Sequence, residues 1–305
     1  MKVGIIGAGG IGGYYAGLLR RDGVDVRLIA RGDHLAAIKA RGLEIRTPED
    51  RFVVQVDASD DGDRLRGCDY VIVAVKGYSL DDIGPMLARA AQGGAAVVPL
   101  LNGVDIAARL EALGVPRSAI IGGLARVSVF RIEPGVIERR SPFERIVVGE
   151  FDRAPSQRTT DLVAALLRAG SLASVSDDIG LDLWRKFAFI VPMTVACGLS
   201  REPAGRVFAR PRGRELVTNS LREIVAVSRG AGTPLTDADE AQISSDLFAL
   251  SANMFPSFYF DLIRGGPTEV ETLAGAVSRL GRACGVPTPV HDVATAAFDI
   301  ATQPK

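Results

Sequence analysis

The first twelve residues of the chain constrain its fold more than any other stretch. A short apolar run leads into glycines at the spacing G-x-G-x-x-G, and a helical pattern follows over residues 14–21. In such a loop the first glycine permits a tight turn, the second lets the backbone approach a pyrophosphate, and the third lets helix pack closely on strand. An ordinary strand–helix turn is the alternative interpretation. We predict a dinucleotide site formed by Gly7, Ala8, Gly9, Gly10, Ile11 and Gly12.

The end of the second predicted strand, residues 24–29, indicates which dinucleotide is bound. A carboxylate at this point would bind the ribose hydroxyls of NAD, but the chain has Arg31 here, and Asp25 lies at the opposite end of the strand. A guanidinium matches the geometry and charge of a 2′-phosphate. The sequence therefore favours NADP, with an ordinary exposed arginine as the alternative. In the helix predicted over residues 33–41, we expect His34 to face solvent.

Further strands alternate with helices in the first half of the chain. Residues 69–75 and 95–101 are apolar runs with a helical pattern between them at 80–91, which predicts a parallel sheet covered on both faces. Lys76 and Asn102 follow the two strands directly. Ligands bind beyond the carboxyl ends of such strands, so both residues join the glycine loop as site candidates.

Two other stretches of the first half predict antiparallel structure. Residues 43–57 alternate loosely around a turn and indicate a small hairpin. Residues 120–150 change to a period of two with turn signals between, and we expect hairpins that close the sheet.

The second half of the chain has almost no strand patterns. A helix over residues 157–169 ends the first part, and helical patterns then follow at 180–199, 212–230, 237–250, 268–285 and 289–302. The predicted fold class is α/β, with an N-terminal Rossmann-type doubly wound sheet followed by an all-helical C-terminal domain. We expect an NADP-binding domain over residues 1–176, a helical substrate and catalytic domain over 177–305, and the active site in the cleft between them.

Composition excludes several other classes of function. The 305 residues contain 36 Lys plus Arg and 36 Asp plus Glu, so net charge gives no reason to expect nucleic acid or an anionic membrane as a partner. Cys68, Cys197 and Cys284 are far apart, which favours reduced thiols. With only His34 and His291, a site of several histidines is excluded, and we predict no metal. No signal peptide or bilayer-spanning run is evident, so the expected location is the cytoplasm.

Two charged residues of the second half are candidates for catalysis. Lys186 stands among large apolar residues in the stretch 183–190, and an ammonium held in such surroundings can serve as a general acid. A lysine whose stem covers apolar surface while its charge reaches water is the alternative. Glu269 follows Pro267 at a predicted helix start, where a carboxylate is also favoured simply by the helix dipole.

The order and spacing of these features resemble the ketopantoate reductase (2-dehydropantoate 2-reductase) family over nearly the whole chain. The resemblance rests on residues 7–12, Val75-Lys76, Asn102-Gly103, residues 183–186, Pro256-Ser257 with Asp261, and residues 267–271. It implies NADPH-dependent reduction of a 2-keto acid, as in pantothenate biosynthesis. It also implies that Lys186 donates a proton to the forming alkoxide, that Glu269 holds Lys186 and the substrate hydroxyl, and that Ser257 binds the substrate carboxylate. Asn102 and Lys76 would contact cofactor or substrate near the nicotinamide.

The chain departs from the family one and two turns after the lysine. Family members often carry asparagines there that bind substrate, whereas this chain has Ile190 and Thr194, with Pro192 between them. The change removes hydrogen bonds and makes one wall apolar, so we expect Thr194 as a remaining substrate contact and a larger or more apolar keto acid. An NADPH-binding sensor or structural protein with weak catalysis, and a 3-hydroxy acid dehydrogenase, are the alternatives. Assembly of the chain into a homodimer is compatible with the sequence.

Overall fold

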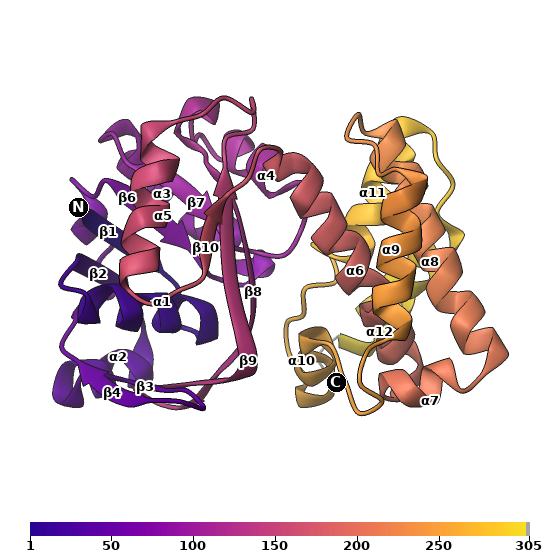
Figure 1. Ribbon diagram of the computed structural model, residues 1–305, viewed down its shortest axis with the longest axis horizontal. Coiled ribbons are helices and arrows are strands. Elements are labelled where there is room, and N and C mark those ends of the chain that lie inside the picture. The colour runs from indigo at the N-terminus through magenta and orange to yellow at the C-terminus, as the bar shows by residue number, and fades with distance from the viewer. Residues whose placement is uncertain (303–305) are drawn as a thin grey trace. The chain divides into compact units, whose positions relative to one another are not determined.

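The computed structural model of the chain describes residues 1–302, which form two compact units. The first consists of residues 1–101 and 106–179 and combines sheets with helices; the second consists of residues 102–105 and 180–302 and is helical (Figure 1). This confirms the predicted fold class of a Rossmann-type sheet followed by a helical part.

A five-stranded parallel sheet forms the centre of the first unit. Its strands, in spatial order, are β5 (Asp57–Ser59), β2 (Asp25–Ile29), β1 (Lys2–Ile6), β6 (Tyr70–Val73) and β7 (Ala96–Pro99). In the register, Gly4 of β1 lies opposite Arg27 of β2 and Val71 of β6. The carboxyl ends of β2 and β6 therefore flank the carboxyl end of β1, where the glycine loop begins.

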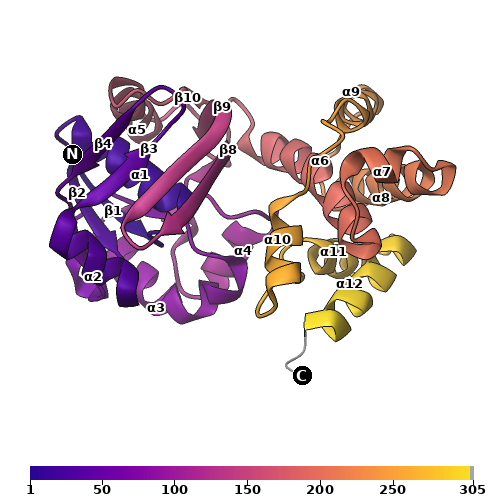
Figure 2. The same ribbon diagram turned by 90° about the horizontal axis from the view of Figure 1, so that it is seen from below.

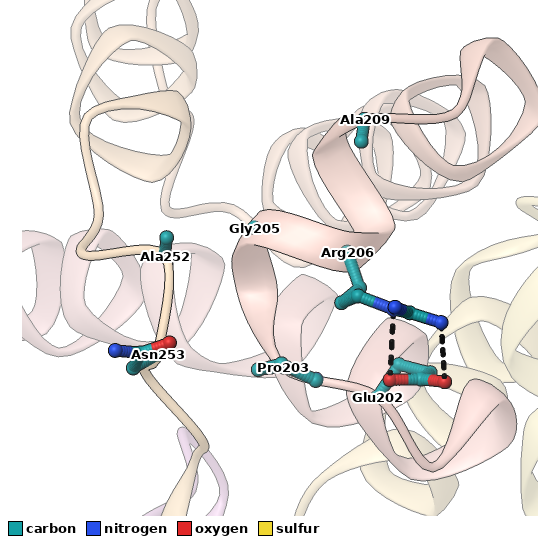
Figure 3. A pocket seen from close by; sticks show the side chains of 7 residues that line it. All are labelled: Glu202, Pro203, Gly205, Arg206, Ala209, Ala252 and Asn253. Carbon is teal, nitrogen blue, oxygen red and sulfur yellow. Dashed lines mark hydrogen bonds and ion pairs between the residues drawn. The ribbon is translucent and has the colours of Figure 1, made fainter.

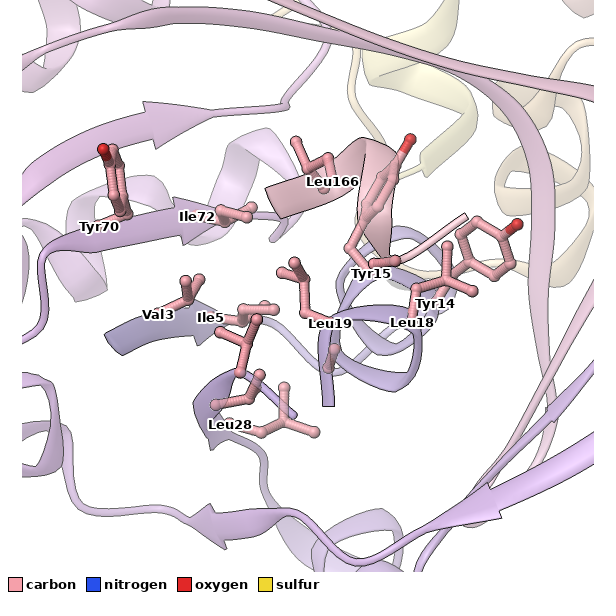
Figure 4. Packing of buried hydrophobic residues seen from close by; sticks show 14 of the residues in the cluster. Val3, Ile5, Tyr14, Tyr15, Leu18, Leu19, Leu28, Tyr70, Ile72 and Leu166 are labelled. Carbon is pink, nitrogen blue, oxygen red and sulfur yellow. The ribbon is translucent and has the colours of Figure 1, made fainter. Parts of the chain in front are cut away.

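Successive residues of these strands pack into two different cores, one on each face of the sheet. Ile5 belongs to one buried cluster and Ile6 to the other, and Ile72 and Val71 divide in the same way. This explains why the strands read as uninterrupted apolar runs. Figure 4 shows the first cluster, in which side chains from β1, β2 and β6 meet Leu19 of the first helix.

Five α-helices accompany the sheets within this unit. They are α1 (Gly10–Arg21), α2 (Gly32–Arg41), α3 (Leu80–Gln92), α4 (Ile106–Ala112) and α5 (Gln157–Arg168). The short 3₁₀ helices are η1 (Gly62–Leu65), η2 (Gly77–Ser79) and η3 (Arg117–Ala119). The helix α4 is absent from the sequence-based prediction; the others agree with it to within a few residues.

A second sheet packs against α1. Its members are β3 (Leu43–Arg46), β4 (Arg51–Val54), β8 (Gly122–Glu133), β9 (Val136–Gly149) and β10 (Ala173–Val175). The long β8–β9 hairpin is visible in Figure 2. Residues 120–150 form the antiparallel hairpin that the sequence predicts, and Ile120 forms a bridge with Val97 of β7, but the hairpin strands belong to this second sheet, where β9 pairs with β8, β3 and β10. Gly13 and Gly17 allow the close approach of α1, since a Cβ there would collide with Ile137 and Ile45.

The second unit contains seven helices within the described residues. They are α6 (Ile179–Ser200), α7 (Ala204–Phe208), α8 (Pro211–Gly230), α9 (Asp237–Phe248), α10 (Ser257–Arg264), α11 (Ala274–Cys284) and α12 (Pro289–Thr302). The helix predicted from residue 268 begins only at Ala274, after turns. Among residues 1–302 no helix is both long enough and apolar enough to cross a bilayer.

Candidate functional site

The three glycines of the fingerprint meet three different surroundings. Gly7 has φ +96°, and a Cβ there would lie 2.7 Å from the carbonyl oxygen of Ala74. A Cβ on Gly12 would lie 2.0 Å from the carbonyl oxygen of Gly7, so α1 can approach β1 only without a side chain. A Cβ on Gly9 would meet nothing within 4 Å. Folding therefore requires glycine at positions 7 and 12, whereas position 9 opens onto free space.

The start of α1 presents backbone donors at this opening. Gly9 is the N-cap, and the first bond across the cap is from Gly13 N–H to Gly9 O at 2.8 Å. The N–H groups of Gly10, Ile11 and Gly12 precede it and so have no partner of the helical i−4 type. The first turn carries no acidic residue. Unpaired N–H groups and the positive end of the helix dipole make this a site for an anion.

Arg31 and Lys76 lie at the same edge of the parallel sheet as the glycine loop. Arg31 follows β2 as the extended N-cap of α2, and its side chain is exposed. Lys76 follows β6 as the extended N-cap of η2 and is half-buried. Because β2 and β6 are the two neighbours of β1, one cationic side chain follows the strand on each side of the loop.

His34 lies in the first turn of α2 and is buried, with 4% of its surface exposed. The expectation that it faces solvent is wrong. Its Nε2 lies 2.7 Å from the carbonyl oxygen of Ala8, and its Nδ1 lies 2.8 Å from the backbone nitrogen of Gly135 in the β8–β9 turn. The spacing of four residues between His34 and Ile38, on the apolar face of α2, is the one local sequence signal that His34 is buried. Its hydrogen-bond partners Ala8 and Gly135 are 26 and 101 residues away and leave no local signal.

Asn102 follows β7 and is half-buried, and the segment 102–105 packs with the helical unit. Asp105 in this segment accepts a hydrogen bond of 2.7 Å from Arg279 of α11. Arg279 also donates to the carbonyl oxygen of Glu271 at 3.1 Å, two residues after Glu269. Arg279 thus ties the segment of Asn102 to the turn that carries Glu269. Sequence reasoning missed both Asp105 and Arg279, which are 174 residues apart.

Lys186 lies on α6 and is half-buried, with the core residues Trp184 and Phe187 on either side of it in sequence. The neighbouring Arg185 is held by Asp239 of α9, with 2.7 Å from Nε to the carboxylate. The same core continues to Phe258 of α10 and Val270. The elements that carry Lys186, Ser257 and Glu269 therefore pack around one hydrophobic core.

Ser257 and Glu269 differ in exposure. Ser257 is the first residue of α10 and is exposed. Glu269 is buried, at 4% exposed, and lies in the turn before α11, not in its first helical turn. Its carbonyl oxygen accepts hydrogen bonds from the backbone N–H groups of Thr272 and Leu273 at 3.2 and 3.1 Å. The turn is thus fixed by its own backbone.

The two residues that replace the expected asparagines lie on α6, which continues through Pro192. Ile190 is half-buried and packs against the core of the helical unit. Thr194 is 2% exposed, and its hydroxyl donates to the carbonyl oxygen of Ile190 at 3.0 Å. The proton of this hydroxyl is already used, so Thr194 can offer another molecule only lone pairs.

A separate pocket of about 610 Å³ lies beside α7 in the helical unit, and no predicted site residue lines it (Figure 3). Its two charged residues, Glu202 and Arg206, pair with each other at 3.3 Å; Arg206 is exposed and Glu202 is half-buried. Within the described part of the chain, no three His, Cys, Asp or Glu residues are grouped as metal ligands.

Known proteins resemble the chain over nearly its whole length. Residues 3–153 match the family model described as ketopantoate reductase PanE/ApbA, and residues 178–300 match the model of its C-terminal part. A 2-dehydropantoate 2-reductase from Mesorhizobium japonicum is 30% identical, covering 97% of this chain and 96% of its own. The oxidoreductase YkpB of Bacillus subtilis, described as uncharacterized, is 28% identical over 95% of both chains.

A solved structure agrees with these sequence matches. The crystal structure of a PanE/ApbA family ketopantoate reductase from Ralstonia eutropha has a TM-score of 0.90 and 29% identity, covering 99% of this chain and 98% of its own. The family models account for both the sheet-containing and the helical parts of the chain. The protein therefore belongs to the ketopantoate reductase family, whose members are oxidoreductases acting on a CH–OH group.

Proposed function

We propose that the protein reduces a 2-keto acid, 2-dehydropantoate or a related compound, to the 2-hydroxy acid with NADPH. NADPH as the cofactor, a 2-keto acid as the substrate and the roles of individual residues go beyond membership of the family. In the reaction, a hydride adds to the keto carbon, the C=O π electrons move to oxygen, and a proton from the protein converts the alkoxide to the hydroxyl. The bound nicotinamide supplies the hydride.

The observation that carries the cofactor assignment is the pairing of an open Gly9 with Arg31. The free space at Gly9 and the unpaired donors of residues 10–12 fit a pyrophosphate. Arg31 is exposed at the carboxyl end of β2, and the strand itself ends without a carboxylate; the nearest one along the chain, Asp33, lies in the first turn of α2. A guanidinium here supports binding of a 2′-phosphate.

The catalytic assignment gives Lys186 the role of general acid. Its ammonium would stabilise the developing alkoxide and then donate the proton, an electrostatic contribution that is often the largest in such sites. Glu269 would orient Lys186 and accept a hydrogen bond from the substrate hydroxyl. Ser257, exposed at the start of α10, would bind the substrate carboxylate. Asn102 and Lys76 would contact cofactor or substrate near the nicotinamide.

The substrate assignment depends on Ile190 and Thr194. An isoleucine in place of an amide offers no hydrogen bond, and Thr194 offers only an acceptor because its proton is donated to Ile190 O. We therefore propose a keto acid whose side chain is more apolar than that of 2-dehydropantoate, with Thr194 as a weak polar contact.

A panel of 2-keto acids followed by NADPH absorbance tests the function. We expect turnover with at least one member and its loss in Lys186→Met, which keeps an unbranched stem but has no proton to donate. Lys39→Met on the exposed side of α2 is the matched control and should leave turnover unchanged. Equal turnover by Lys186→Met and the wild type would overturn the role of Lys186.

The cofactor assignment has its own test. Arg31→Ala should weaken NADPH binding about tenfold or more, the effect of losing a charged hydrogen bond of ~1.5–3 kcal/mol, and should leave NADH binding nearly unchanged. Arg212→Ala, an exposed arginine of α8, serves as the control. Equal losses for the two nucleotides would refute contact with the 2′-phosphate.

A sensor that binds NADPH without efficient catalysis is the second candidate, and the packing of Ile190 against the core favours it. It predicts tight NADPH binding with no turnover across the whole panel. The presence of Lys186, Ser257 and Glu269 together supports the reductase instead, because a sensor needs none of these groups.

A further inference from the structure

The ring of His34 connects the glycine loop to the β8–β9 hairpin. It accepts a hydrogen bond from Gly135 N–H at Nδ1 and lies 2.7 Å from Ala8 O at Nε2. Gly10 provides a second close approach between loop and hairpin, since a Cβ there would lie 2.4 Å from Val129 O of β8. The loop is thus held from α2 and from β8 at once.

Only one form of the imidazole satisfies both neighbours. The backbone nitrogen of Gly135 can only donate, so Nδ1 must carry no proton. The carbonyl oxygen of Ala8 can only accept, so Nε2 must carry one. The geometry therefore specifies the neutral ring protonated at Nε2. A second proton would place N–H against N–H at the Gly135 side.

The bond to Ala8 fixes the direction of a donor in the loop. The Ala8–Gly9 peptide is planar and trans, so its C=O and N–H point to opposite sides. With Ala8 O turned towards His34, the Gly9 N–H points away from α2. Gly9 is both the N-cap of α1 and the residue that opens onto free space. The ring thus controls the orientation of the peptide where a pyrophosphate would approach.

We propose that His34 is a positioning residue for the dinucleotide, and that its protonation weakens nucleotide binding. The neutral ring holds residues 7–12 in the conformation that presents their N–H groups. This inference rests on the cofactor half of the proposed function. It adds a residue that touches no cofactor atom and acts through the Ala8–Gly9 peptide.

The surroundings of the ring set the pH range of this effect. Burial lowers the pKa of His34, the hydrogen bond to Ala8 raises it, and the charge of Arg131 on β8 lowers it, so that the net pKa lies below 6.5. Other charged groups on these elements are Asp33, Lys39 and Arg41 of α2 and Arg126 and Glu133 of β8, and residues 7–12 carry none. The unfolded chain then binds the proton more readily, so stability is full above pH 6.5 and declines below it.

Two variants separate hydrogen bonding from titration. His34→Gln supplies an amide oxygen for Gly135 N–H and an amide N–H for Ala8 O, and it does not titrate. His34→Phe keeps the ring and removes both bonds. We would measure the dissociation constant of NADP⁺ from about pH 4.5 to pH 8, a range that extends well below the usual histidine pKa because the pKa of His34 is lowered. The 2′-phosphate and all other groups titrate equally in His34→Gln, so the ratio to the wild type isolates His34.

At pH 8 we expect His34→Gln to bind NADP⁺ like the wild type and His34→Phe to bind about tenfold more weakly, the effect of ~1.4 kcal/mol. As the pH falls below 6.5 and through the lowered pKa of His34, the wild type should lose affinity relative to His34→Gln. A pH-independent ratio would overturn the effect of protonation. Wild-type affinity in a folded His34→Phe would overturn positioning, because a merely structural residue changes the melting temperature and not the dissociation constant.

The cofactor-free protein gives an independent measurement. Only two histidines are present, so ¹⁵N-histidine spectra of the wild type and His34→Gln identify the His34 signals. We expect a protonated Nε2 and an unprotonated Nδ1; the opposite tautomer would overturn the inference. Wild-type protein that binds neither NADP⁺ nor NAD⁺ would overturn the proposed cofactor site and this role together. Binding that is insensitive to His34→Phe would overturn this role alone.

Discussion

Replacing Gly9 or Gly12 by alanine should separate the ligand-binding and packing roles of the glycine loop. The two positions lie three residues apart at the start of α1, and the substitution adds one methyl group in each case. The methyl group on Gly12 would lie 2.0 Å from the carbonyl oxygen of Gly7, whereas the one on Gly9 would meet nothing within 4 Å. Each variant is therefore the control for the other.

The structure gives the expected magnitudes. Ordinary contact begins at 3.4 Å, so Gly12→Ala forces a displacement of about 1.4 Å between α1 and the end of β1. Overpacking costs ~1–3 kcal/mol, and rigid backbone on both sides places this variant near 3 kcal/mol, or roughly 6–12 °C in Tm. Gly9 has φ −70°, which alanine adopts freely. Alanine is a poorer N-cap than glycine, which lowers stability, but it also reduces the entropy of the unfolded chain, which raises stability. The two effects oppose each other, so the free energy of unfolding should change by less than ~1 kcal/mol.

Thermal unfolding without ligand and a titration of NADPH fluorescence test the pair. We expect Gly12→Ala to melt at a clearly lower temperature. Gly9→Ala should melt like the wild type and yet bind NADPH at least tenfold more weakly, because its methyl group occupies the space of the pyrophosphate. Wild-type affinity in Gly9→Ala would refute a pyrophosphate at this position, and an unchanged Tm in Gly12→Ala would refute the close packing.

Three further predictions concern stability and specificity. Arg158 donates two hydrogen bonds of 2.7 Å to Glu150, so Arg158→Lys should reduce the free energy of unfolding by ~1–3 kcal/mol in urea, against less than ~1 kcal/mol for the exposed Arg153→Lys. Burial raises the pKa of Glu150, but the hydrogen bonds from Arg158 and Ser156 and the charge of Arg158 together outweigh it, so the pKa lies below 4.5. Stability should therefore fall as the pH drops below 4.5, and less so in Glu150→Gln. Ile190→Asn should raise kcat/KM for 2-dehydropantoate relative to an apolar keto acid by about tenfold, and an unchanged ratio would refute the role of Ile190 in specificity.

Most of the fold could be predicted because its signals are local. Buried strands and amphipathic helices leave periodic patterns in a single window of sequence, and the parallel sheet follows from their alternation. The second sheet could not be predicted in this way. Its strand β9 pairs with β8 beside it but also with β3, about ninety residues earlier, and with β10. Such pairings depend on which edges are left after α1 has packed, and no local pattern records this.

Short helices that lie between proline and glycine residues also cannot be predicted from the sequence pattern. The helix α10 has only eight residues, bounded by Pro256 and Gly265, so its apolar pair Phe258 and Leu262 is too short a pattern to be distinguished from a loop. The sequence places the start of α11 too early, at residue 268, because Pro267 and Glu269 are typical of a helix N-terminus. In the structure the backbone of residues 269–273 forms turns before the helix begins.

In the candidate site, too, the features with local sequence signals could be predicted and those that depend on distant partners could not. The backbone roles of residues 7–12 follow from their spacing between a strand and a helix. Lys186 and Glu269 are candidates from their sequence surroundings, but their specific roles, and that of Ser257, come only from the family resemblance. His34 and Arg279 were not recognised, since their partners lie 26 to 174 residues away. A buried polar residue is identified by the group it satisfies, and that group is set by tertiary structure.

Gly9 carries the strongest argument that the loop is built for a ligand. Glycine is required by a positive φ at Gly7 and by a backbone collision at Gly12, so folding alone explains both. Neither reason applies at Gly9, which has an ordinary φ and free space around its Cβ position. As an N-cap, serine or aspartate would stabilise α1 better than glycine does. A side chain there would fill the space above the unpaired N–H groups, and an aspartate would repel a phosphate. Glycine at this position thus makes α1 less stable than serine or aspartate would, but it leaves the anion site open.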